Sequence, residues 1–218
     1  MNLSSLIVYR NILNDPVIKA FEEIKPDSGG EAQAVQAFFS VLIEKAEENG
    51  LSGNIFARYL LLLILNDENI FSISCENKKI THDKSLYKIM LWDAQILFNY
   101  LHADFSKILT GPFQDLLGAN YTPLNTNPMP ETQIGGLSSD SPESFLNFLA
   151  NYYSENGCGQ IAQYRMLKYS SKKLVGVKNY DKITFDRIVG YQYQKKQIIL
   201  NTKAFLAGEK AHNILLSG

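Results

Sequence analysis

Cysteine and long apolar runs are both scarce in this sequence. Its two cysteines, Cys75 and Cys158, lie far apart and without CxxC spacing, so the sequence indicates neither a disulfide framework nor a zinc site. The most apolar run, residues 59–65, is much shorter than the roughly 20 residues of a membrane-spanning helix. The first ten residues lack the basic start of a signal peptide. These absences predict a cytoplasmic protein that does not act at a membrane.

Neither sign of charge is in excess. Lys and Arg number 21 and Asp and Glu 22, giving a net charge of −1, so no overall positive field indicates nucleic acid or anionic membrane as a partner. The charge is unevenly distributed: residues 1–150 contain 10 basic and 18 acidic side chains, whereas residues 151–218 contain 11 and 4. A chain of 218 residues can form one large or two small domains. The asymmetry indicates a division between its two parts.

The first 119 residues have the apolar spacing of helices. Asp15-Pro16 is typical of a helix N-terminus. Ser28 and Glu31 have the spacing of a capping box, before a helix that reaches Asn49-Gly50. Ser52 is expected to cap a third helix that is buried on most of its circumference. We therefore predict a helical N-terminal domain over residues 1–119.

Two further segments belong to this domain. Residues 70–82 contain a short strand-like alternation followed by Asn77-Lys78-Lys79, which favours a loop or a weak hairpin. From Asp83, apolar residues continue at helical intervals until Gly111-Pro112 must end the helix.

The composition changes after residue 119. Residues 120–141 are rich in Pro, Gly and Ser and poor in apolar side chains, which predicts a flexible linker or loop. Ser141-Pro142 starts another helix. The β-prone runs 166–169 and 174–177 predict a hairpin. We therefore expect residues 142–182 to form a helix followed by a β-hairpin.

Residues 183–218 are the most informative segment. They predict an extended stretch ending at Gly190, then a helix that stops at Gly208, then a short buried strand at residues 213–217. A glycine after such a strand, here Gly218, is how a phosphate-binding P-loop begins.

At these residues the sequence resembles the AAA+ ATPases, in which a Phe-Asp-x-Ile-Val-Gly-like segment, here residues 185–190, precedes a helix and the strand that leads to the Walker A loop. The wider pattern resembles the bacterial AAA+ group catalogued as domain of unknown function 815. That pattern comprises Gln163-Tyr164-Arg165, Leu174-Val175-Gly176-Val177, Val189-Gly190-Tyr191, residues 201–208 and 213–216, and, in the helical N-terminal region, residues 9–16, Asp67-Glu68-Asn69 and Phe71-Ser72.

The resemblance implies a mainly α chain: a helical N-terminal domain, a small β-hairpin, and over residues 183–218 the first elements, a helix and a strand, of an α/β AAA+ P-loop domain. It implies that Ile188, Val189, Gly190 and Tyr191 form one wall of a nucleotide pocket beside the adenine, and that Gly218 begins the phosphate loop. On the residues alone, Ile188 and Val189 could instead be core residues and Gly190 a turn.

The sequence departs from that family where catalysis would occur, because Walker A beyond Gly218, Walker B, the sensors and an arginine finger are absent. We expect the chain to be the N-terminal regulatory or substrate-engaging region of an ATPase. ATP and Mg²⁺ would then be bound only by the full-length protein, which would act on an unknown protein partner. This chain by itself is expected to hydrolyse no ATP, to contain no catalytic residues and to bind no metal. Because the predicted strand at residues 213–217 would lack its neighbours, the chain could self-associate through it.

Two alternative functions remain open. The chain could be a stand-alone helical protein-interaction module. It could also be a nucleic-acid adaptor, the less favoured reading, that uses lysines interleaved with tyrosines in its basic C-terminal part. These residues are Lys172, Lys173, Lys178, Lys182, Lys195 and Lys196, with Tyr164, Tyr169, Tyr180, Tyr191 and Tyr193.

The other candidate residues are better explained by structural roles than by catalysis or metal binding. The histidines, His82, His102 and His212, have no metal-binding spacing. Cys158 lies between two glycines with no fixed base nearby, which favours an inert thiol. Asp186 is interpreted as a cap for the turn into residues 188–190.

Overall fold

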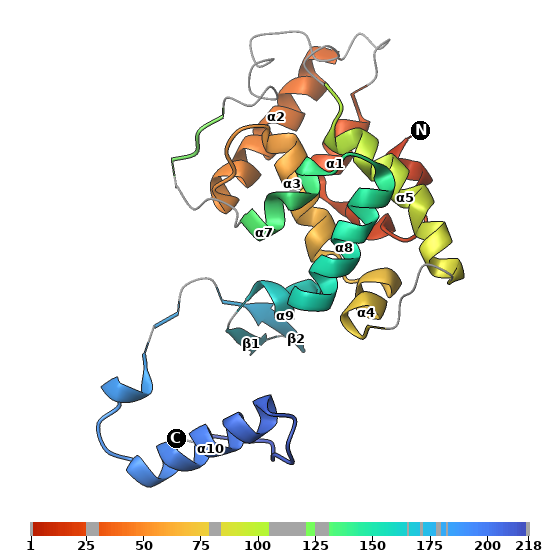
Figure 1. Cartoon of the computed structure of the whole chain (residues 1–218). Helices are drawn as coiled ribbons and strands as arrows, with labels where there is room; N and C mark the ends of the chain where they lie inside the picture. The colour runs from red at the N-terminus through yellow and green to blue at the C-terminus, as the bar shows by residue number, and fades with distance from the viewer. Residues whose placement is uncertain are drawn as a thin grey trace. The chain divides into compact units, whose positions relative to one another are not determined.

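The computed structural model (Figure 1) describes residues 2–24, 31–78, 84–104, 121–124, 131–164, 166–170, 172–177, 180–181 and 183–216. The chain divides into two compact units, Met1–Val177 and Lys178–Gly218, called unit 1 and unit 2 below. Several residues that the sequence analysis singled out, including the predicted cap Ser28, lie outside the described residues: Ser28, Lys79, His82, Asp83, Gly111-Pro112, Arg165, Lys178, Lys182, Ser217 and Gly218.

In the part of unit 1 that the structure describes, the regular elements are helices and one hairpin, as predicted. Its α-helices are α1 (Pro16–Glu22), α2 (Glu31–Asn49), α3 (Ile55–Asn66), α4 (Ile70–Glu76), α5 (Ser85–Leu101), α7 (Glu131–Ile134), α8 (Pro142–Asn156) and α9 (Gly159–Gln163). The described residues of unit 1 also include the 3₁₀ turns η1 (Leu3–Ser5), η2 (Arg10–Asn14) and η4 (Gly135–Ser138). Among the described residues, no helix has the length and hydrophobicity that crossing a bilayer requires.

Helix starts follow the local capping signals in most places. Asp15 caps α1 by accepting hydrogen bonds from the amides of Val17 (2.8 Å) and Ile18 (3.3 Å), and Ser141 caps α8 with Pro142 in its first turn. Ser52 is the exception. The cap of α3 is Asn54, whose Oδ1 accepts a hydrogen bond from the amide of Ala57 at 3.0 Å.

The prediction of a loop or hairpin at residues 70–82 is wrong for Ile70–Glu76, which form α4. Asn69 and Ser72 make a reciprocal capping box: the Asn69 side chain accepts from the Ser72 amide at 3.0 Å, and Ser72 Oγ accepts from the Asn69 amide at 2.9 Å. Phe71 and Cys75, one helical turn apart, are buried, and α4 packs against α8. The helix is stabilised by its cap and by this packing, and the alternation of residues 70–73 does not decide the structure.

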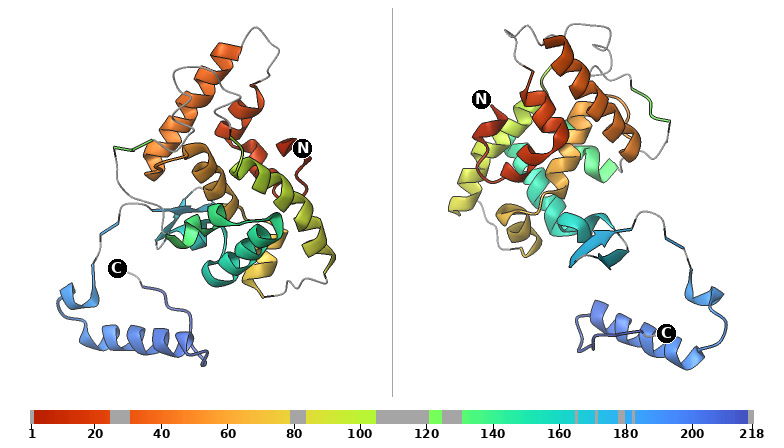
Figure 2. Two further views of the ribbon diagram at one scale, coloured as in Figure 1. Left: turned by 45° about the horizontal axis from the view of Figure 1, so that its top comes forward. Right: turned by 180° about the vertical axis from the view of Figure 1, so that it is seen from behind.

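Helix α3 runs through the middle of unit 1 (Figure 2), where it contacts α2, α5 and α8. Its buried side chains lie around most of its surface, as its sequence predicted. Phe56 stacks on Phe21 of α1, with ring centroids 4.7 Å apart, and meets Phe38 of α2 edge to face at 5.7 Å. This aromatic group joins three helices at one end of the core.

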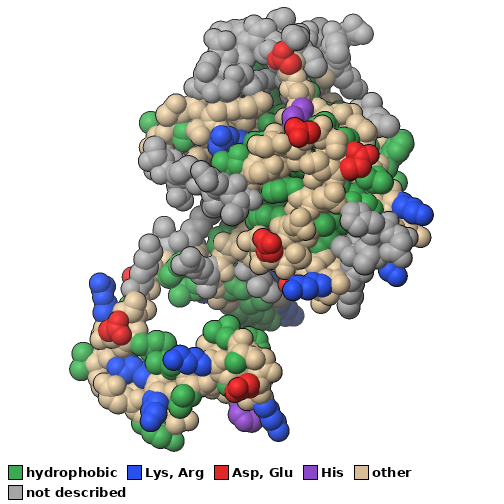
Figure 3. Space-filling view, in the orientation of Figure 1, with side chains coloured by type: hydrophobic (Ala, Val, Ile, Leu, Met, Phe, Trp, Pro, Cys, Tyr) green, Lys and Arg blue, Asp and Glu red, His purple; other side chains and the backbone are tan. Residues whose placement is uncertain are grey.

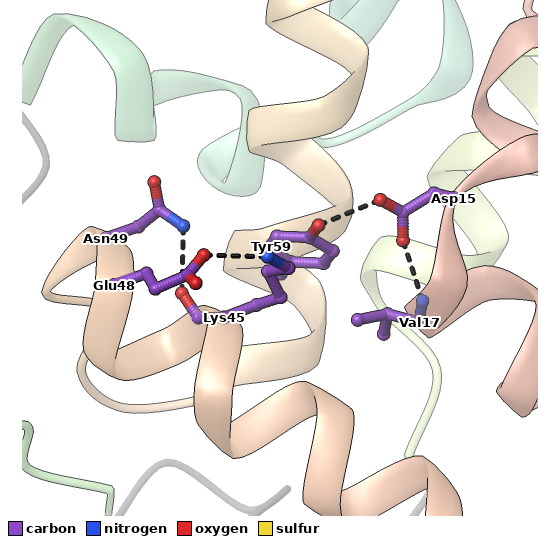
Figure 4. Close-up of polar contacts among 6 residues, drawn as sticks. All are labelled: Asp15, Val17, Lys45, Glu48, Asn49 and Tyr59. Carbon is purple, nitrogen blue, oxygen red and sulfur yellow. Dashed lines mark hydrogen bonds and ion pairs between the residues drawn. The ribbon is translucent and has the colours of Figure 1, made fainter.

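A hydrogen bond also connects α3 to the start of α1 (Figure 4). The Tyr59 hydroxyl on α3 donates to Asp15 Oδ2 at 2.8 Å, so one carboxylate both caps α1 and holds it against α3. On α2, Lys45 and Glu48 form an ion pair of 2.7 Å, and the Asn49 side-chain amide donates to the Lys45 carbonyl at 2.8 Å. Burial and the carboxylate of Asp15 raise the pKa of Tyr59, which keeps its hydroxyl a donor.

The N-terminal segment is held by a buried carboxylate. Asp93 on α5 is fully buried and accepts hydrogen bonds from the backbone amides of Ile7 (2.9 Å), Val8 (2.7 Å) and Tyr9 (3.1 Å). Three donors on one carboxylate satisfy its charge away from water. Residues about 85 positions apart in sequence are thereby joined.

A second buried polar group connects the N-terminal segment to α8 and α3. The hydroxyls of Tyr9 and Tyr153 lie 2.9 Å apart, and Tyr153 donates to the Ile64 carbonyl at 2.5 Å. Since the single proton of Tyr153 goes to Ile64, Tyr9 is the donor between the two hydroxyls. Burial raises the pKa of both tyrosines, so both stay protonated.

Asp67, beside this group, gives unit 1 a pH-dependent stability. Burial, together with the charge of Glu68, raises the pKa of Asp67, while hydrogen bonds from Asn69 and Asn11 oppose the shift. The pKa of Asp67 is higher in the folded chain than in the unfolded chain, so the protonated carboxyl stabilises the fold. This stabilisation is fully present below the ordinary pKa of 3.8 and is lost as the pH rises through the raised pKa.

In Asp67→Asn the free energy of unfolding should fall less as the pH rises above 4, because the amide does not ionise. The variant should be more stable than wild type near pH 7, because the amide oxygen still accepts from Asn69 and no buried charge remains. Urea unfolding between pH 4 and pH 7.5 measures this, with the exposed Asp140→Asn as the control. An unchanged pH dependence in Asp67→Asn would contradict the assignment.

Part of the predicted linker is packed. Within residues 120–141, α7 and η4 lie between Glu131 and Ser138. A Cβ on Gly136 would lie 2.8 Å from the Phe148 ring and 3.0 Å from Leu61, so the turn sits close against α8 and α3. His102 adds a contact, with Nε2 3.2 Å from the Leu137 carbonyl.

Unit 1 ends in the predicted hairpin. Strands β1 (Leu167–Ser170) and β2 (Lys173–Gly176) pair antiparallel, with Tyr169 opposite Leu174. Nearly all of their side chains are exposed. The hairpin is attached through Gly176, where a Cβ would lie only 2.1 Å from the Tyr164 ring, so the aromatic ring rests directly on the glycine backbone.

Unit 2 contains η5 (Phe185–Arg187), α10 (Gln192–Leu206) and the residues that follow. The predicted helix is present. The predicted strand at 213–217 is not formed in residues 213–216, which are irregular and exposed, and Ser217 lies outside the described residues. A strand needs ladder hydrogen bonds from a neighbouring strand, and within unit 2 the described residues include none.

Candidate functional site

The candidate site is the turn between η5 and α10, residues 188–191. Ile188 is the C-cap of η5, and Gly190 and Tyr191 adopt consecutive left-handed conformations, with φ of 78° and 55°. The left-handed region suits glycine and is unfavourable for tyrosine. The amides of Val189 and Gly190 have no partner among the described residues.

The side chains of this turn are exposed. Val189 is 91% exposed and Tyr191 70%, whereas Ile188 is 38% exposed. Ile188 and Val189 are therefore not core residues within unit 2. An exposed apolar pair beside free backbone amides could bind a flat, partly apolar ligand with hydrogen-bonding edges, such as a nucleobase.

One lysine fixes this turn to the helix that follows. Lys195 Nζ donates to the carbonyls of Ile188 (2.8 Å) and Phe185 (3.3 Å). The Lys195 amide also donates to the Tyr191 carbonyl at 2.9 Å, which begins α10. Lys195 therefore holds the turn at both ends.

A second side chain of α10, that of Asn201, holds the chain that follows the helix. The Asn201 side chain accepts from the His212 amide at 2.9 Å and donates to the His212 carbonyl at 2.7 Å. This paired contact resembles one rung of an antiparallel ladder and brings the chain back along the helix. Sequence reasoning identified neither Lys195 nor Asn201 in these roles.

None of the described residues of unit 2 is buried. Figure 3 shows hydrophobic side chains on its surface beside lysine and arginine. The large exposed hydrophobic residues are Ile183, Phe185, Ile188, Val189, Tyr191, Tyr193, Leu200, Phe205, Leu206, Ile214, Leu215 and Leu216. So much exposed apolar surface on a short segment indicates a surface that another part of a protein covers.

The other candidates from the sequence do not assemble into a site. Cys158 is buried and donates to Glu76 at 3.3 Å; burial raises the pKa of Cys158 to about 11 and that of Cys75 to about 12, so neither is a reactive thiolate at neutral pH. Asp186 was predicted to cap the turn into residues 188–190; it lies inside η5, and its side chain makes no such hydrogen bond among the described residues. Within the described ranges no group of three His, Cys, Asp or Glu residues could hold a metal ion.

Comparison with known families finds a relationship in the C-terminal part of the chain. Residues 159–218 match the family described as protein of unknown function (DUF815). The resemblance to this family is thus confirmed for these residues. The match begins at α9 and includes the hairpin, the 188–191 turn and α10. No curated protein and no solved structure matches the chain.

Proposed function

We propose that unit 2 is the beginning of an ATP-binding AAA+ P-loop domain and that the helical part of unit 1 is its N-terminal regulatory or substrate-engaging region. One observation carries the proposal: unit 2 has the order expected for this segment, an exposed turn, a helix and an apolar tail, yet buries none of its described residues. An apolar tail such as Ile214, Leu215 and Leu216 is stable at the centre of a sheet, which the remainder of the domain would supply.

The 188–191 turn would form one wall of the nucleotide pocket. Ile188 and Val189 offer apolar contact to the faces of the base, and the amides of Val189 and Gly190 are free to donate to its edge. The phosphates of ATP, with Mg²⁺, would be bound by the loop that Gly218 begins. On this proposal the described residues hold the base and carry out no chemical step.

The proposal is tested first by the coding sequence after codon 218, which should continue in frame through Gly-Lys-Ser or Gly-Lys-Thr. The extended chain should then bind and hydrolyse ATP with Mg²⁺, and the 218-residue chain should show no turnover above background. The control is the extended chain with the P-loop lysine replaced by alanine. A frame that ends without this motif, or turnover by the short chain, would contradict the proposal.

The exposed apolar residues also favour a second candidate, a helical protein-interaction module in which a separate protein, or a second copy of the chain, covers unit 2. Amide exchange of residues 213–216 distinguishes the two. If the amides of residues 213–216 are protected from exchange only in the extended chain, the result supports the ATPase domain. Protection in the short chain that grows with its concentration, together with dimers in sedimentation, supports self-association.

A further inference from the structure

The lysine that holds the 188–191 turn lies at an electrostatically unfavourable position. Lys195 is in the first turn of α10, where the helix dipole disfavours positive charge. Its side chain is half-buried, whereas that of the neighbouring Lys196 is exposed. The hydrogen bonds from Nζ to the carbonyls of Phe185 and Ile188 offset this unfavourable interaction.

The two carbonyls belong to the two ends of one short segment. Phe185 is the first residue of η5 and Ile188 is its C-cap, so the ammonium group bridges the two ends of this turn and restrains its backbone. The residues that follow immediately, Val189 and Gly190, have the free amides. Holding the Ile188 carbonyl therefore restrains the peptide directly before the donors.

We propose that Lys195 is a positioning residue for recognition of the nucleotide base. It does not touch the nucleotide; it holds the backbone of the turn in the conformation in which the Val189 and Gly190 amides meet the base edge. This inference rests on the proposed function of the turn. Preorganised donors bind more tightly because less ordering is needed on binding, and donors at fixed positions discriminate between bases with different edges.

The test compares ATP and GTP binding by the extended chain and its variants. Lys195→Met should weaken ATP binding about tenfold, which corresponds to about 1.4 kcal/mol, and weaken GTP binding less, so that the preference for ATP falls. Lys195→Arg should restore most of the preference, because a guanidinium can donate to two carbonyls. Lys196→Met, with the same loss of charge on the same helix, should bind as wild type.

A purely structural role would weaken both nucleotides equally and leave the ATP preference unchanged, and that result overturns the inference. Equal behaviour of Lys195→Met and Lys196→Met also overturns it while leaving the proposed function intact. If the wild-type extended chain binds neither nucleotide, the proposed function fails and the inference with it.

The contact itself is tested in the 218-residue chain without nucleotide. The amides of Arg187 and Ile188 donate within η5, to Thr184 at 3.0 Å and Phe185 at 3.4 Å. Their hydrogen exchange should accelerate in Lys195→Met and not in Lys195→Arg or Lys196→Met. Unchanged exchange in Lys195→Met would show that the lysine does not hold the turn, whatever the nucleotide affinity.

Discussion

Replacing Asp93 by alanine is expected to lower the free energy of unfolding of unit 1 by about 3–5 kcal/mol, because three backbone amides lose a charged acceptor and two of them lie in or beside the core. Tyr9 is fully buried and Val8 packs against the core, whereas Ile7 is exposed and its amide can bind water. The loss is thus less than three full desolvation penalties. Asp93→Asn should lose less than Asp93→Ala, since the amide keeps one acceptor oxygen.

Urea unfolding measures this effect, and the chain has a convenient probe. Trp92 is the one tryptophan in the sequence, precedes Asp93, and donates from Nε1 to the Ser5 carbonyl at 3.2 Å. Its fluorescence should therefore report release of the N-terminal segment. Asp140→Ala, at an exposed position, is the control and should change stability by no more than about 0.5 kcal/mol. An Asp93→Ala variant as stable as that control would show that the three amide contacts do not hold the segment.

Removing the hydroxyl of Tyr153 should lower the stability of unit 1 by about 2–3 kcal/mol, more than removing that of Tyr9, because two buried groups lose a partner. In Tyr153→Phe the Ile64 carbonyl loses one of its two donors, keeping the Asp67 amide at 3.1 Å, and the buried Tyr9 hydroxyl loses its acceptor. In Tyr9→Phe the bond to Ile64 remains, and we expect a loss of about 1 kcal/mol.

The adjacent Tyr152→Phe is a matched control. Tyr152 is also mostly buried, but among the described residues its hydroxyl has one hydrogen bond, a long one of 3.4 Å that it accepts from Gln133. Its loss should not exceed about 1 kcal/mol. The double variant Tyr9→Phe/Tyr153→Phe should lose less stability than the sum of the two single variants. In Tyr153→Phe alone the buried Tyr9 hydroxyl has no acceptor, and the double variant removes that hydroxyl. Equal losses for Tyr9→Phe and Tyr153→Phe would contradict this order of donors.

Features that depend on neighbouring residues could be predicted from the sequence. The Asp15-Pro16 and Ser141-Pro142 signals correctly placed the starts of α1 and α8, because a cap involves atoms only two or three residues apart. The hairpin was predicted for the same reason, since its two strands are joined by a short turn. The helical period likewise predicted α3 and α5, but the second helix was expected to continue from Asp83 to Gly111-Pro112 and instead ends at Leu101, with His102 as its C-cap.

The candidate site was only partly predictable. The Phe-Asp-x-Ile-Val-Gly-like pattern drew attention to residues 188–191, and the family match includes them. Nothing in that pattern indicated that Lys195 holds the turn, because a lysine that folds back onto carbonyls has no spacing rule. The one available signal was its unfavourable place in the first turn of a helix.

By itself the sequence determined the helical character of unit 1, the caps Asp15 and Ser141, and the hairpin, since each depends on contacts within a few residues. Tertiary structure decided much of the rest. Residues 70–76 form α4 because α8 packs against this helix, in which Phe71 and Cys75 are buried, in addition to the local capping box of Asn69 and Ser72. Asp93 became an anchor because folding brings residues 7–9 to α5. Residues 213–216 remained without strand structure because a strand exists only when a second strand accepts and donates its hydrogen bonds.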